Sequence, residues 1–211
     1  MTPGLQEARL YGILDLGYVA ERDAMTIARQ MLLGGVQLLQ LRAKNMRPPQ
    51  ICPLARDLAC LCRAHRVPLL LNDHPELVQE TGAQGAHVGQ DDLSVAEARA
   101  LAGEFAIIGK STHSLEQIAA AGQEKPDYAG FGPLFATPTK RDYPPIGLVN
   151  ITEAQRLVSL PVFCIGGIKL DNLSKVLAAG AQRVVIVSGI LQAPDPQAYC
   201  QACRGILSGK S

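Results

Sequence analysis

Eight short apolar runs alternate along the chain with segments of helical periodicity. Segment 23–35, for example, has apolar residues at 24, 25, 27, 28, 31 and 32, and Gly34 and Gly35 follow as a stop signal. A second helix is predicted within 171–182, with Asp171 as its N-cap. The β-strands are predicted at 9–15, 36–42, 68–73, 85–90, 106–111, 127–132, 161–167 and 183–189.

This regular alternation of strands and helices predicts an α/β fold. Parallel strands joined by right-handed helical crossovers, eight times in 211 residues, predict a compact (β/α)8 TIM barrel that occupies residues 1–211 as a single domain. The alternative is an open doubly wound sheet, which usually has fewer strands or a glycine fingerprint after its first strand. Residues 15–23 (DLGYVAERD) contain no such fingerprint, so we prefer the barrel.

Polar residues gather where the predicted strands end. Gln40, Arg42 and Lys44 lie two apart at the end of an otherwise apolar strand, and residues two apart in a strand share a face. In a TIM barrel the carboxyl ends of all strands meet at one mouth, which holds the active site. We therefore expect one polar pocket, with Gln40 deepest. Later strands add ND at 72–73, QDD at 90–92 and STH at 111–113.

Two strand ends that carry glycine indicate a bound anion. IGGI (165–168) and VSGI (187–190) follow the seventh and eighth strands, where TIM barrels commonly bind phosphate through backbone N–H groups. Glycine lets the backbone approach an anion closely, although Gly-Gly is also found in simple tight turns. TPTK (137–140) adds two hydroxyls and an ammonium on a long loop, 132–150, and predicts a second anionic contact.

Asp73 and Asp92 close the third and fourth strands, which would be neighbours in the barrel. Two carboxylates would repel a nearby anion unless a cation lay between them, and Mg²⁺ commonly binds one or two carboxylates together with substrate phosphates. Alternation turns the adjacent Asp91 the other way. The competing interpretation is helix capping, for which Ser94 is another candidate. We favour Mg²⁺, with the neighbouring Arg and Lys side chains around a metal-bound pyrophosphate.

Two histidines belong to the predicted barrel interior and mouth. His113, close to Ser111, can act as an acid or base or form a hydrogen-bonding wall, and the sequence leaves both roles open. His87 lies within a strand and is interpreted as a satisfied core histidine.

Composition and charge narrow the classes of function. The net charge of +1 and the 4% aromatic content argue against binding to nucleic acid or to an anionic membrane. The chain has neither a signal-peptide pattern nor an apolar run as long as a membrane span, so we expect a cytoplasmic protein with reduced cysteines. Cys200 and Cys203 are interpreted as packing residues of a terminal amphipathic helix. A homo-oligomer is compatible with the sequence.

Several of these segments, in this order, resemble the thiamine phosphate synthase family. The resemblance runs from Gln40 to Ile190, nearly the whole predicted barrel. Each motif is weak alone, and the set is specific. The matching segments are QLRAK, LLNDHPEL, GAHVGQDD, GKSTHS, DYAGFGPLFATPTKRD, CIGGI and VVIVSGI.

The resemblance implies a (β/α)8 barrel that joins a hydroxymethylpyrimidine pyrophosphate to a thiazole phosphate, with Mg²⁺, and releases pyrophosphate. It also implies the site residues. Gln40 and Ser111 would hold the pyrimidine, and Asp73 and Asp92 would hold Mg²⁺. The pyrophosphate would bind Arg42, Lys44, Asn72 and Lys140. The thiazole phosphate would bind Thr137, Thr139, the Gly167 backbone, Val187 and Ser188. The catalytic roles would fall to Arg42, Lys44, Ser111 and Lys140.

Two departures and two alternatives accompany this resemblance. Lys110 stands where the family more often has a small apolar residue, and alternation aims it towards the helix layer, where a buried cation needs a partner. VSGI replaces the commoner VSAI. The sister family of thiazole tautomerases shares the barrel but typically lacks the second metal carboxylate and the Thr-x-Thr-Lys loop, and we rank it second. A non-catalytic sensor of thiamine intermediates ranks third.

Overall fold

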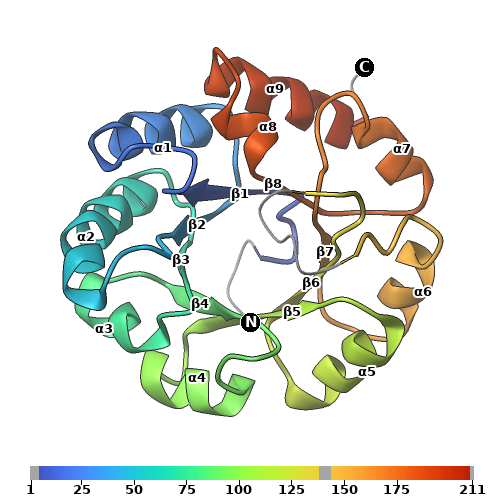
Figure 1. Cartoon of the computed structure of the whole chain (residues 1–211), viewed down its shortest axis with the longest axis horizontal. Helices are drawn as coiled ribbons and strands as arrows, with labels where there is room; N and C mark the ends of the chain where they lie inside the picture. The colour runs from blue at the N-terminus through green and yellow to red at the C-terminus, as the bar shows by residue number, and fades with distance from the viewer. Residues whose placement is uncertain (1–4, 138–143, 210–211) are drawn as a thin grey trace.

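The computed structural model describes residues 5–137 and 144–209. Eight parallel strands form one closed barrel in the order β1 to β8, and helices surround it (Figure 1). The strands are β1 (Leu10–Asp15), β2 (Leu38–Arg42), β3 (Leu69–Asn72), β4 (Gly85–Val88), β5 (Ile107–Thr112), β6 (Tyr128–Phe131), β7 (Val162–Cys164) and β8 (Val184–Ile186). The α-helices are α1 (Ala24–Leu33), α2 (Pro48–Ala64), α3 (Val78–Thr81), α4 (Val95–Ala102), α5 (Leu115–Glu124), α6 (Ile151–Arg156), α7 (Leu173–Ala178), α8 (Ser188–Leu191) and α9 (Pro196–Leu207). Two 3₁₀-helices are η1 (Glu21–Asp23) and η2 (Pro75–Leu77).

The predicted (β/α)8 barrel is confirmed. All eight strands lie within one or two residues of their expected starts, and each pairs in parallel with the next. The barrel closes where Leu10 of β1 pairs with Val184 of β8, which excludes the open doubly wound sheet. An all-parallel barrel of this kind buries both faces of its strands, which explains why the strands are apolar runs.

Local signals explain several helix boundaries. Helix α1 ends at Leu33 and Gly34 is its C-cap, as the sequence predicts. Ser94 caps α4, because its hydroxyl accepts a hydrogen bond from the backbone N–H of Glu97. The prediction of Asp171 as a helix cap is wrong. Helix α7 begins at Leu173 and Asn172 occupies the N-cap position, where its side chain bonds the preceding loop instead.

Two apolar layers enclose the strands. The larger one lies between the strands and the surrounding helices. The smaller one fills the barrel and includes Tyr11, Tyr128 and Phe163, whose rings meet edge to face with centroids 5.5–5.8 Å apart. Alternation along the strands sends one set of side chains into each layer.

Cys200 and Cys203 belong to the outer layer. Both are fully buried on α9, and burial raises the pKa of each thiol to about 12. Their interpretation as helix-packing residues is therefore confirmed.

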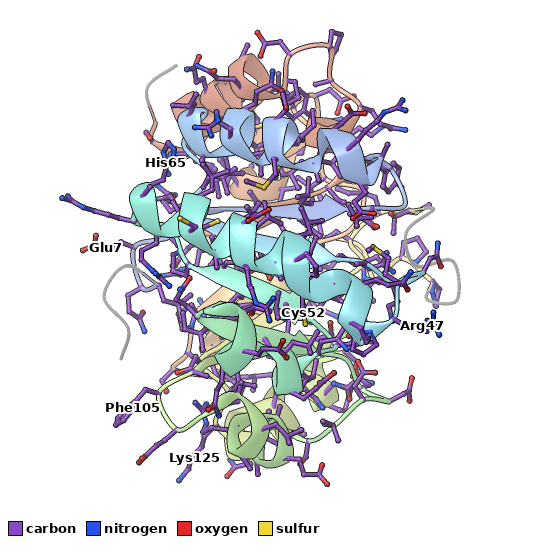
Figure 2. All side chains as sticks on the ribbon, turned by 90° about the vertical axis from the view of Figure 1, so that its left-hand side faces the viewer. Glu7, Arg47, Cys52, His65, Phe105 and Lys125 are labelled. Carbon is purple, nitrogen blue, oxygen red and sulfur yellow. The ribbon has the colours of Figure 1, made fainter. Side chains whose placement is uncertain are left out.

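The side view identifies the two ends of the barrel. Glu7, Phe105 and Lys125 precede strands and lie together at one end, whereas Arg47, which follows β2, lies at the other (Figure 2). The end near Arg47 is the mouth formed by the carboxyl ends of the strands. No helix among the described residues is long and apolar enough to cross a membrane.

Candidate active site

A pocket that is open to solvent lies at the carboxyl ends of the strands, with an empty volume of about 780 Å³ that includes open solvent. Its walls come from strands and loops far apart in sequence, as the barrel topology requires. Of the predicted site residues, the pocket is lined by Gln40, Arg42, Asn72, Ser111, Thr137, Gly167, Val187 and Ser188. Thr139 and Lys140 lie outside the described residues.

Arg42, at the end of β2, is held by an acid that the sequence analysis missed. Its Nη1 lies 2.7 Å from Oδ2 of Asp15, the last residue of the neighbouring β1. The Asp15 side chain is only 3% exposed, and its other oxygen accepts a hydrogen bond from the backbone N–H of Gly17. This arrangement fixes the guanidinium at the pocket wall before any ligand binds. An aspartate ending a strand beside Arg42 was the signal available in the sequence.

Lys44 and Asp73 do not line this pocket but form an ion pair beside it. Lys44 Nζ lies 2.7 Å from Asp73 Oδ2, with side chains 50% and 21% exposed. Asp73 follows β3 with φ +61°, a left-handed conformation that aspartate tolerates better than most residues. The predicted pyrophosphate ligand and the predicted metal ligand therefore contact each other directly.

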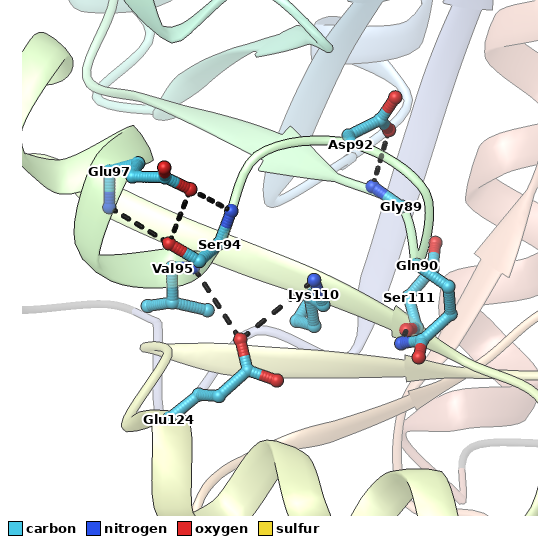
Figure 3. A network of polar contacts seen from close by, with 9 residues as sticks. All are labelled: Gly89, Gln90, Asp92, Ser94, Val95, Glu97, Lys110, Ser111 and Glu124. Carbon is cyan, nitrogen blue, oxygen red and sulfur yellow. Dashed lines mark hydrogen bonds and ion pairs between the residues drawn. The ribbon is translucent and has the colours of Figure 1, made fainter.

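Asp92 lies in the loop after β4 and does not cap a helix. Its Oδ2 accepts a 2.7 Å hydrogen bond from the backbone N–H of Gly89, while Ser94 caps α4 (Figure 3). Gln90, in the same loop, donates through its side chain to the backbone carbonyl of Ser111, which ties the loop to the end of β5. The capping interpretation of Asp92 is excluded by this geometry.

The chemistry of Asp73 and Asp92 fits Mg²⁺. Both are oxygen donors in segments that follow the adjacent strands β3 and β4, and Oδ1 of Asp73 makes no hydrogen bond with the described residues. Within the described ranges no three His, Cys, Asp or Glu side chains are grouped to hold a metal by themselves. A magnesium ion that takes one or two carboxylates and completes its shell with water and substrate phosphate needs no third protein ligand.

The glycines after β7 serve a packing need. Gly166 and Gly167 have φ of +97° and +66°, and a Cβ on them would lie 2.3 Å from Pro133 Cβ and 2.6 Å from Phe135 Cβ, respectively. The loop after β6 therefore packs directly on this turn. Thr137, further along this loop, also lines the pocket. Close approach of two backbones is one reason for glycine that the sequence analysis did not consider.

Comparison with known proteins adds to this geometry. The model of the thiamine monophosphate synthase family matches residues 10–190. The thiamine-phosphate synthase of Halalkalibacterium halodurans is 37% identical over 204 residues, 96% of this chain and 97% of that protein. The one from Thermus thermophilus is 44% identical over 180 residues, 84% of this chain and 86% of that protein. The chain belongs to the thiamine monophosphate synthase family.

Solved structures agree with this membership. The thiamine phosphate pyrophosphorylase from Pyrococcus furiosus has a TM-score of 0.88 and 28% identity, and the match covers 97% of both chains. The 3-hexulose-6-phosphate synthase from Salmonella typhimurium has a TM-score of 0.71 at 14% identity, over 96% of this chain and 100% of that one, and shows a shared barrel fold alone.

Lys110, which the sequence analysis singled out, does not line the pocket. It is 4% exposed, and its Nζ lies 3.8 Å from Oε2 of Glu124 on α5 (Figure 3). The prediction that Lys110 faces the helix layer and needs a partner there is confirmed. The side chain of Glu124 is 37% exposed, so water reaches one side of the pair.

Two histidines line the pocket, and one of them bonds a buried tyrosine. His113 lines the pocket, and its Nδ1 donates to the backbone carbonyl of Gly132. His87 also lines the pocket and bonds Tyr128 Oη and Ser111 Oγ, both at 2.8 Å. The interpretation of His87 as satisfied is confirmed, but it is more than a core residue because it contacts a predicted site residue. Tyr128 was missed, although a tyrosine inside a buried strand signals a hydroxyl that needs a partner.

Proposed function

We propose that this chain joins 4-amino-2-methyl-5-hydroxymethylpyrimidine pyrophosphate to 4-methyl-5-hydroxyethylthiazole phosphate. The bond between the pyrimidine methylene carbon and the pyrophosphate oxygen breaks with both electrons leaving on oxygen. A bond from the thiazole nitrogen to that carbon forms, which gives thiamine phosphate and pyrophosphate. This family member is therefore a transferase. The observation that carries the proposal is the convergence of amide, hydroxyl, guanidinium and glycine-bearing loops on one pocket.

Gln40 and Ser111 hold the pyrimidine ring in this proposal. Gln40 is 1% exposed and lies a step deeper than Arg42 on the same face of β2, so an amide buried there is expected to serve a polar ligand. The aminopyrimidine stabilises a cation at its methylene when pyrophosphate departs. The protein then has to position the two substrates and stabilise the charge of the departing pyrophosphate, and it needs no nucleophile of its own.

Arg42, Lys44, Asn72 and Lys140 stabilise the departing pyrophosphate. Arg42 grips two oxygens while lysine acts as a point charge. Asp73 and Asp92 would hold Mg²⁺, which supplies charge neutralisation to the pyrophosphate oxygens. The short Lys44–Asp73 ion pair supports this proposal, because a ligand anion can draw the exposed ammonium away at little cost.

Thr137, Thr139, the Gly167 backbone, Val187 and Ser188 bind the thiazole phosphate. Four of these line the pocket, in the segments that follow β6, β7 and β8. We place the thiazole ring between this phosphate site and the pyrimidine, so that its nitrogen meets the methylene carbon. We further propose that the protein acts in the cytoplasm on these two small molecules, as a monomer or homo-oligomer.

The deciding experiment supplies purified protein with both substrates and Mg²⁺ and follows thiamine phosphate and pyrophosphate. Equal formation of both products is expected. The matched control gives the same protein a thiazole carboxylate phosphate, the substrate that a tautomerase would isomerise. Isomerisation there, with no product from the two-substrate reaction, would replace the proposed reaction with that of the sister family.

A further inference from the structure

A hydrogen-bonded chain of five side chains, here named the relay, crosses the interior of the barrel. It runs from Gln40 through Tyr11, Tyr128 and His87 to Ser111. The Gln40 Nε2–Tyr11 Oη distance is 2.5 Å and the distance between the phenol oxygens is 3.0 Å. His87 joins Tyr128 through Nδ1 and Ser111 through Nε2, both at 2.8 Å. Its ends are the two residues proposed to hold the pyrimidine.

The two tyrosines at the centre of the relay are buried. Tyr11 is 1% exposed and Tyr128 0%, and both rings pack edge to face on Phe163. Burial is the main reason why the pKa of each phenol rises well above its ordinary value, so both hydroxyls keep their protons. A buried hydroxyl left without a partner is costly, so each proton here has to be accepted by the next group.

This requirement gives the relay one direction. The Gln40 amide nitrogen only donates, so the Tyr11 oxygen accepts, and the Tyr11 proton has Tyr128 as its one acceptor among residues 5–137 and 144–209. Tyr128 then donates to Nδ1 of His87, which places the imidazole proton on Nε2. Nε2 donates to Ser111 Oγ. The hydroxyl proton of Ser111 remains for a group in the pocket, and the side-chain carbonyl of Gln40 remains as an acceptor.

The two ends therefore present opposite hydrogen-bonding character to the pocket that both of them line. A 4-aminopyrimidine offers the complement, because its ring nitrogens accept and its exocyclic amine donates. A 4-oxopyrimidine of the same shape has a carbonyl in place of the amine and a proton on the adjacent ring nitrogen. Its carbonyl would meet the side-chain carbonyl of Gln40, which also accepts, and its ring N–H would meet the hydroxyl of Ser111, which also donates.

We propose that Tyr11, Tyr128 and His87 are positioning residues that hold Ser111 as a donor and Gln40 as an acceptor, and so select an aminopyrimidine over its oxo analogue. The inference rests on the proposed function of the pocket. Cutting the relay at Tyr128 releases both ends. His87 can then place its proton on Nδ1 and accept from Ser111, which removes the donor that faces the ligand.

The test measures binding of two probes by calorimetry, the 4-amino pyrimidine alcohol and its 4-oxo analogue. For the native chain we expect at least a roughly 100-fold preference for the amino probe, since unpaired buried polar groups reject the wrong analogue strongly. Tyr128→Phe keeps the ring and removes the hydroxyl, and should lower this preference at least roughly 10-fold. Tyr11→Phe should do the same. The double variant should cost no more than either single one, because the relay acts as a unit.

The matched control is Phe163→Leu, which disturbs the same aromatic cluster and breaks no hydrogen bond. This variant should be less stable, but its preference for the 4-amino probe over the 4-oxo probe should be unchanged. An unchanged preference in both Tyr variants would overturn the inference and leave the relay with a structural role alone. An equal loss in Phe163→Leu would do so too. Turnover of the native protein with both substrates separates the two proposals, because it tests the reaction while the probe ratio tests the relay.

Discussion

The two polar regions of the site hold their groups in different ways. The relay consists of neutral side chains, and its centre is fully buried. The second region, here named the rim, consists of Asp15, Arg42, Lys44, Asp73 and Asp92, and is charged. Its exposure rises outward, from 3% for the Asp15 side chain to 50% for that of Lys44.

This difference separates selection from binding. The buried, neutral side chains of the relay cannot exchange hydrogen-bond partners without leaving a polar group unpaired. Their arrangement is therefore already formed before the ligand binds. Exposed ion pairs are worth little and exchange readily, which suits a region that must hold pyrophosphate and then release it. Arg42 lies between these limits, because its partner Asp15 is as buried as the relay.

Removal of an outer carboxylate should have the largest effect. Asp92→Ala is expected to lower kcat roughly 100- to 1,000-fold, since it removes a proposed ligand of the charge-neutralising metal. Thiazole phosphate binding should be retained. Chelation of divalent metal should silence the native enzyme to a similar extent, and added Mg²⁺ should restore it.

Asp91→Ala is the matched control for that variant. It removes the adjacent carboxylate of the same loop, which is not a proposed metal ligand, and should leave turnover near the native rate. If Asp91→Ala were the inactive variant and Asp92→Ala the active one, the metal ligand would have been assigned to the wrong aspartate.

Asp15→Asn tests whether the buried partner fixes Arg42. The change keeps the size of the side chain and the acceptor for Gly17, but removes the charge that holds the guanidinium at 2.7 Å. We expect kcat to fall roughly 10-fold, with a smaller change in KM for the pyrimidine pyrophosphate, because positioning rather than binding is lost. Unchanged kcat with a lower KM would mean that Asp15 chiefly offsets the charge of Arg42.

The fold and the mouth of the barrel could be predicted because both follow from repeated local patterns. Strand alternation gave the barrel, and residues two apart on β2 gave the shared face of Gln40 and Arg42. Parallel strands end at one edge, so the polar strand ends had to meet. Alternation along β5 also correctly predicted that Lys110 and Ser111 lie on opposite faces of this strand.

The missing parts depend on contacts between strands distant in sequence. The Tyr11–Tyr128 hydrogen bond joins residues 117 positions apart, and no periodicity reports which two inward side chains meet inside a barrel. The Asp15–Arg42 pair needs the register of β1 on β2. Asp171 failed as a helix cap for a different reason, because Asn172 satisfies the loop from Gly167 to Lys169 and the helix starts after it.

Lys44→Gln should have a smaller effect than either change at an aspartate. The ammonium is half exposed, so its loss is worth about 1 kcal/mol, and KM for the pyrimidine pyrophosphate should rise roughly five-fold. Salt should raise the KM of the native enzyme more than that of the variant, because screening acts on the same exposed charge. A change in the preference for the amino probe would contradict the separation of rim and relay.

Lys110→Met should have the smallest effect on activity of all these substitutions. Lys110 and Lys44 are both cations near strand ends, but Lys110 faces the helices and pairs with Glu124 rather than with a site residue. Replacing a buried ammonium by an apolar chain of similar length is often neutral for stability, and Glu124 keeps its contact with water. We expect native kcat and KM, and a free energy of unfolding in urea within about 1 kcal/mol of the native value. A large loss of activity would show that charge on the outer face of β5 reaches the site, and the face of a strand would then be a poor guide to which lysines act in this barrel.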